Sequence, residues 1–153
     1  MKKNSHRSIT NHLPTLVLLL ALIGCGASEI KPIDIFPEDT CANCRMAISD
    51  KAFASQLITE HRDVFKFDDL ECLLSYKKKN AGLKIAATFV KDFESKEWLH
   101  YEKSAIVKTS AKTPMGSGLV AFKDSMKARE FAKNYPPPDA KVEKPSCCAD
   151  EEE

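Results

Sequence analysis

The chain has 153 residues, which is about the size of one domain and is enough to bury one modest hydrophobic core. Its 23 Lys and Arg residues nearly balance 22 Asp and Glu residues, and no strongly basic stripe runs along the sequence. The chain therefore lacks the electrostatic signature of a nucleic-acid-binding protein, and we expect no nucleic-acid partner.

Residues 1–24 have the pattern of an export signal. A basic segment precedes an apolar stretch at 16–23, which is shorter than the roughly 20 apolar residues that span a bilayer. The stretch ends in the letters LIGC, which resemble the lipobox of bacterial lipoproteins, where cleavage leaves the cysteine to be diacylated. We expect Cys25 to be lipidated and to hold the mature protein at the cell envelope, facing the periplasm or exterior. Gly26 is compatible with sorting to an outer membrane, and an exported protein with a free Cys25 is the less favoured alternative.

Export changes the interpretation of the other cysteines, because thiols outside the cytoplasm tend to be oxidised or bound to metal. Five cysteines follow the lipidation site: Cys41, Cys44, Cys72, Cys147 and Cys148. Since five is an odd number, at least one thiol is unpaired or is used for something other than a disulfide.

The sequence predicts a tether at 25–38 followed by a globular part at 39–135. The tether carries two prolines and shows no sustained periodicity. The globular part opens with two β-rich runs, 53–59 and 64–67, which are separated by a polar turn and indicate a hairpin.

A helix is predicted directly after the hairpin. Asp68 and Glu71 have the spacing of a capping box, and leucines follow at helical intervals until a glycine at position 82. The run at 84–90 is a further strand candidate.

The second half repeats this plan. Short strand-like runs at 97–101, 105–109 and 118–122 precede a helix that Asp124 or Ser125 would cap. We therefore predict an α+β fold with a duplicated ββα unit. Residues 136–153 are rich in proline and then acidic, which is typical of a flexible tail.

Three sulfur side chains lie within six residues at Cys41, Cys44 and Met46. Three kinds of site fit this pattern, namely a structural disulfide, a redox dithiol and a site for a soft metal ion, and a CxxC pair does not distinguish them. Cys44 and Met46 point to one side only if the chain between them is extended. We therefore expect a turn that carries both cysteines and leads into a strand near Met46.

Methionine narrows the choice, because thioether sulfur is a soft donor that suits Cu(I) and is a poor ligand for zinc. Most methionines pack in the core, however, and Met46 could do the same. Met115 lies in a glycine-rich loop, where it either packs as a plug at the edge of the core or is exposed to bind a ligand. Taken alone, the loop favours a plug.

Three segments, CANCRM, FKFDDLECLLSY and TPMGSGLVAF, occur in this order behind the lipobox. Together they resemble the NosL family, the accessory lipoproteins of nitrous oxide reductase assembly, over roughly 39–135. The resemblance implies a non-enzymatic Cu(I) metallochaperone built from two related ββα-type units. Its partners would be nitrous oxide reductase or the ABC-type machinery that assembles it.

By position, the resemblance implies Cys44, Met46 and Met115 as the Cu(I) ligands. The family usually has glycine where this chain has Arg45, and glycine adopts backbone angles that arginine disfavours. The loop geometry could therefore differ in this chain.

Cys72 lies about 200° around the predicted helix from Leu70, so the leucine stripe does not explain it. It could be an auxiliary copper ligand, pair with Cys41, or be a buried inert thiol. Cys41 is the other candidate auxiliary ligand.

Two rival functions remain. A thiol–disulfide oxidoreductase would use Cys41 and Cys44, but such a pair belongs at the start of a helix, and the residues that follow show no helical stripe. In a structural lipoprotein, Cys41 and Cys44 would form a stabilising disulfide, and this function would leave Met115 unexplained.

Overall fold

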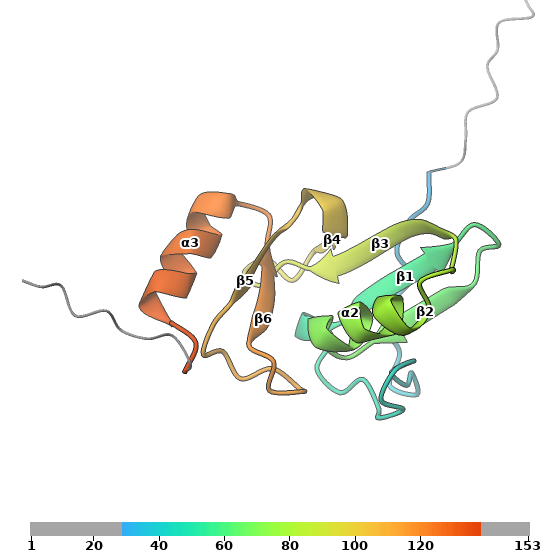
Figure 1. The fold of residues 1–153 in the computed structure, drawn as a ribbon, viewed down its shortest axis with the longest axis horizontal. Coiled ribbons are helices and arrows are strands. Elements are labelled where there is room, and N and C mark those ends of the chain that lie inside the picture. Colours follow the sequence, from blue (N-terminus) through green and yellow to red (C-terminus); the bar gives the residue numbers. More distant parts are fainter. Residues whose placement is uncertain (1–28, 139–153) are drawn as a thin grey trace, which may run out of the picture.

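The computed structural model describes residues 29–138, shown as the coloured ribbon in Figure 1. The predicted signal peptide, the predicted lipidation site Cys25 and the tail cysteines Cys147 and Cys148 lie outside the described residues.

The first ββα unit begins with the predicted hairpin. Strands β1 (Ser55–Thr59) and β2 (Val64–Phe67) pair antiparallel, and helix α2 (Leu70–Lys79) follows at once. The first strand starts two residues later than predicted, because Asp50 caps a short 3-10 helix, η2 (Lys51–Phe53), by accepting a hydrogen bond from the Ala52 N–H.

Two more strands extend this sheet beyond the hairpin. Strand β3 (Ile85–Lys91) pairs with the free edge of β1, and β4 (Trp98–His100) pairs with β3, so that the strand order is β2-β1-β3-β4. All three pairings are antiparallel. Strand β1 is therefore central, and all five of its residues are buried.

The second ββα unit consists of β5 (Ala105–Lys108), β6 (Leu119–Phe122) and helix α3 (Ser125–Asn134), preceded by the 3-10 helix η3 (Tyr101–Lys103). Strands β5 and β6 form a two-stranded antiparallel sheet. Figure 1 shows α3 beside these strands at one end of the molecule and α2 against β1 and β2 at the other. The predicted α+β fold with a duplicated ββα unit is confirmed.

The apolar side chains form two core clusters, and the two sheets are joined at Asp92. One cluster packs Leu57, Phe67 and Leu73 between the larger sheet and α2, whereas the other packs Phe122 beneath α3. The buried Asp92 carboxylate accepts the Lys123 N–H at 2.8 Å, next to a parallel bridge between Asp92 and Ala121. The two sheets are therefore joined at this point.

Among residues 29–138, we find no helix with the length and hydrophobicity of a membrane span.

Candidate metal centre

The two CxxC cysteines lie on a closed turn, as predicted. The Cys41 N–H donates to the Met46 carbonyl at 2.8 Å, and Thr40 and Ala47 form an antiparallel bridge behind it. The turn is fixed to β2, because the Ala42 N–H donates to the Lys66 carbonyl at 2.8 Å. The strand expected near Met46 is reduced to that single bridge, since the chain soon turns into η2.

Arg45 has a left-handed backbone conformation, with a φ of 68°. Cys44 and Met46 are therefore not joined by extended chain, and the expected strand-like alternation does not apply to them. The left-handed region is the one that glycine enters most easily. Arginine thus keeps a glycine-like turn and bears the conformational cost, which is of order 1 kcal/mol.

We expect Arg45→Gly to leave the free energy of unfolding unchanged or to raise it by up to about 1 kcal/mol, because relief of strain outweighs the extra freedom of the unfolded chain. Arg45→Val should lower it by about 1–3 kcal/mol, since a β-branched residue is a strong outlier at positive φ. Urea unfolding of the two variants measures the difference. If valine were tolerated as well as glycine, the turn would not require the left-handed conformation.

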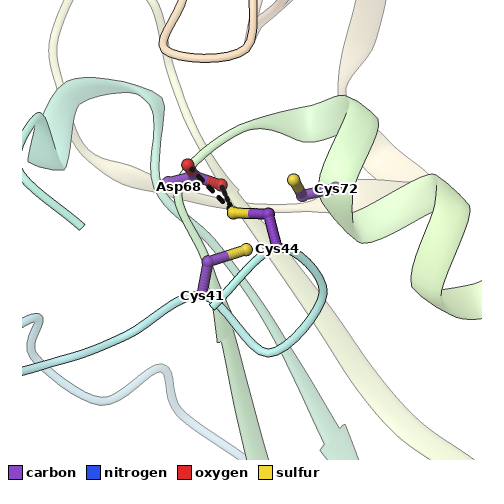
Figure 2. A group of neighbouring side chains, drawn as sticks. All are labelled: Cys41, Cys44, Asp68 and Cys72. Carbon is purple, nitrogen blue, oxygen red and sulfur yellow. Dashed lines mark hydrogen bonds between the residues drawn. The ribbon is translucent and has the colours of Figure 1, made fainter. Parts of the chain in front are cut away.

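The turn and the start of α2 bring four potential metal ligands together. The sulfur atoms of Cys41, Cys44 and Cys72 and a carboxylate oxygen of Asp68 all lie within 4.8 Å of one another. Figure 2 shows Cys41 and Cys44 on the turn, with Asp68 and Cys72 across from them. Cys41 and Cys72 are 0% and 2% exposed, whereas Cys44 is half-buried.

Asp68 reaches this cluster because it is not the helix cap. The predicted capping box is wrong by one residue: the N-cap of α2 is Asp69, whose carboxylate accepts the Glu71 N–H at 2.8 Å. The Asp68 carboxylate instead accepts a hydrogen bond from the Cys44 thiol, with sulfur–oxygen distances of 3.6 and 3.8 Å (Figure 2). Sequence reasoning missed Asp68 as a site residue, although two successive aspartates before a helix leave one of them available for another role.

Burial raises the pKa of the Cys41 thiol and of the Cys72 thiol, and the neighbouring Asp68 carboxylate raises both further. Cys41, Cys44 and Cys72 are free thiols in this structure. A bound metal cation deprotonates a thiol outright, because its charge offsets the cost of a buried thiolate. The raised pKa therefore favours the neutral form of the two buried thiols, Cys41 and Cys72, and a cation beside them would favour the thiolates.

The two predicted methionine ligands lie at the surface. Met46 is 49% exposed and Met115 is 42% exposed, so neither is a core residue and Met115 is not a plug. Asp69 anchors the loop of Met115: its carboxylate accepts the Met115 N–H at 3.0 Å and the Ser117 hydroxyl at 2.7 Å. The TPMG segment is thereby placed at the start of α2, next to Asp68.

The structure thus brings Cys44 together with the two auxiliary candidates, Cys41 and Cys72. It places Met46 on the cysteine turn and docks the Met115 loop beside the same helix start. Binding of one ion by Cys44, Met46 and Met115 remains a prediction.

Comparison with known proteins relates the chain to one family and to a solved structure. The family model NosL matches residues 32–136. Among solved structures, the chain is similar to the copper chaperone NosL from Shewanella denitrificans, with a TM-score of 0.62 and 18% sequence identity. That likeness covers 69% of this chain and 87% of the other, and at this identity it concerns the fold. No curated protein sequence matches the chain.

Proposed function

The chain belongs to the NosL family, and on this premise we propose that it is a Cu(I)-binding metallochaperone. It would deliver copper during assembly of nitrous oxide reductase or of a related extracytoplasmic cuproprotein. The observation that carries the proposal is the convergence of soft donors at the start of α2, where three thiols meet and the TPMG loop is docked alongside.

The donors suit a cargo ion that must be both held and released. Cys44 supplies an anionic thiolate, and its half-buried position keeps it within reach of an acceptor. Met46 and Met115 supply neutral thioethers that are already exposed. Soft donors of this kind select Cu(I), and an incoming sulfur ligand can replace a thioether more easily than a thiolate. Transfer would therefore proceed by ligand exchange, without an enzymatic step.

The geometry disfavours the oxidoreductase alternative. A redox CxxC pair lowers its thiol pKa at the start of a helix. Here Cys41 and Cys44 lie on a turn that precedes the 3-10 helix η2, and burial raises the pKa of Cys41. A thiol with these properties is a poor nucleophile at neutral pH.

We expect the reduced protein to take up close to one equivalent of Cu(I) under anaerobic conditions. A suitable form is the full-length chain with Cys25, Cys147 and Cys148 changed to serine, purified in detergent, so that only the clustered thiols remain. A competition titration with a chromophoric Cu(I) chelator gives stoichiometry and affinity, and an insulin reduction assay runs beside it. Efficient insulin reduction with negligible copper uptake would contradict the chaperone function and support the oxidoreductase function.

The proposed copper acceptor is nitrous oxide reductase or its ABC-type assembly machinery. The protein would meet this acceptor at the cell envelope, where a lipid on Cys25 would anchor it. We expect the native chain to fractionate with membranes and Cys25→Ser to remain uncleaved or soluble, because each buried methylene of the acyl chains contributes about 0.8 kcal/mol. Recovery of the native protein in a detergent-free soluble fraction with a free N-terminus would contradict the anchor.

A further inference from the structure

The candidate soft donors differ in exposure, from the surface to the interior. Met46 and Met115 are 49% and 42% exposed, Cys44 is half-buried, and Cys41 and Cys72 are almost fully buried. The exposed members are neutral thioethers, whereas the buried members are thiols. Cys44 stands between the two sets, since it shares the turn with Met46 and lies within 4.8 Å of both buried sulfurs.

We propose that the site has two positions for one copper ion, an outer position at Cys44, Met46 and Met115 and an inner position at Cys41, Cys44 and Cys72. Cys44 is common to both and acts as the pivot between them. The inner position stores Cu(I) away from solvent, and the outer position presents it to an acceptor. This inference rests on the proposed function, because it assumes that the ion carried is Cu(I).

The step between the positions is a ligand exchange. Cu(I) keeps its bond to the Cys44 thiolate, loses its bonds to the two thioether sulfurs, and gains bonds to Cys41 and Cys72. The two thiols give up their protons to water as the new copper–sulfur bonds form. The copper oxidation state does not change, so no oxidant or reductant is needed.

The chemistry of the donors gives each position its role. Thiolates are anionic and bind Cu(I) more strongly than thioethers, so the inner position should release the ion more slowly. A cation there would also offset the charge of Asp68, a carboxylate that is only 2% exposed and accepts a hydrogen bond from Cys44. Because Cys41 and Cys72 are buried, an acceptor protein can reach the ion only after it has moved outward.

The donor set also fits a competing cation. Three cysteines and one aspartate can complete the closed tetrahedral shell of a structural zinc site. The exposed methionines favour copper, because zinc would make no use of them and would leave two large apolar side chains in water beside the site. The test below therefore also offers Zn²⁺ to the protein in competition with Cu(I).

The test compares two double variants in the full-length chain whose Cys25, Cys147 and Cys148 are serine. Met46→Leu/Met115→Leu removes the outer thioethers and should still bind one equivalent of Cu(I). It should release the ion to an excess of chromophoric chelator at least about tenfold more slowly than the parent does. Cys41→Ala/Cys72→Ala removes the inner thiols and should release Cu(I) at least about tenfold faster than the parent does.

Val120→Ala is the matched control, because Val120 is buried in the other core cluster and its truncation leaves a cavity without removing a donor. It should release copper at the parental rate. Thermal unfolding of the apo forms shows which variants are folded. The methionine variant changes two exposed side chains, so it tests the inner position even if the cysteine variant does not fold.

Three results would overturn the inference while leaving copper binding by the parent intact. They are release at the parental rate from either double variant, complete loss of Cu(I) from the methionine variant, and uptake of Zn²⁺ in place of Cu(I) by the methionine variant. Absence of Cu(I) binding in the parent itself would instead overturn the proposed function, and the inference with it.

Discussion

Cys44→Ser should abolish tight Cu(I) binding and leave the apo fold nearly unchanged. Cys44 belongs both to the cluster of thiols that the structure brings together and to the proposed outer site, so its loss removes the anionic donor from the exposed side of the site. Losing a residue that merely orients a metal ligand costs about 10- to 100-fold in affinity, so losing this ligand should cost more than about 100-fold. The fold should tolerate the change, because Cys44 is half-buried and the serine hydroxyl can still donate to Asp68.

Met46→Leu and Met115→Leu are the comparison variants for this prediction. Each removes a soft donor while nearly conserving volume, and should change the free energy of unfolding by less than about 1.5 kcal/mol. Their Cu(I) affinities should fall by much less than in Cys44→Ser, because the inner thiols of the proposed two-position site still hold the ion. Competition with a chromophoric chelator and thermal unfolding of the apo forms measure both quantities. Unchanged affinity in Met115→Leu would remove Met115 from the site, and retained tight binding in Cys44→Ser would contradict the whole donor assignment.

Much of the fold could be predicted from the sequence, because its signals are local. The polar turn between 59 and 64 marks the β1–β2 hairpin, and the run of lysines marks the end of α2. The repeat of a strand, an aspartate and a helix revealed the second unit. In both units the aspartate directly before the helix is the N-cap, at Asp69 and Asp124.

The candidate site was harder to predict from the sequence, because it depends on contacts between distant segments. The choice between Asp68 and Asp69 as the cap is a matter of one residue, yet it decides which carboxylate faces Cys44. Periodicity showed only that Cys72 is off the leucine stripe, whereas the structure places its sulfur beside Cys41, Cys44 and Asp68. Arg45 could not be assigned a conformation from its type, since arginine rarely adopts the positive φ that this turn imposes.

The largest effect on stability is expected for Asp69→Ala. Asp69 is fully buried, and its carboxylate accepts hydrogen bonds from the Glu71 N–H, the Met115 N–H and the Ser117 hydroxyl, at 2.8, 3.0 and 2.7 Å. Loss of an N-cap costs about 1 kcal/mol, and each of the other two donors, which are partly buried, costs about 1–2 kcal/mol when it is left unpaired. We therefore expect a loss of roughly 3–5 kcal/mol in the free energy of unfolding.

Asp124→Ala provides the matched control, because Asp124 caps α3 through the Met126 N–H alone among the contacts described and is exposed. It should cost only about 1 kcal/mol, the value of a simple cap. Urea unfolding of both variants measures the difference. Ser117→Ala, which removes one of the three donors to Asp69, should fall between them. If Asp69→Ala cost no more than Asp124→Ala, the carboxylate would not be holding the TPMG loop. Where the folded fraction allows a titration, Asp69→Ala should also bind Cu(I) more weakly, because the loop that carries Met115 would no longer be anchored to the start of α2.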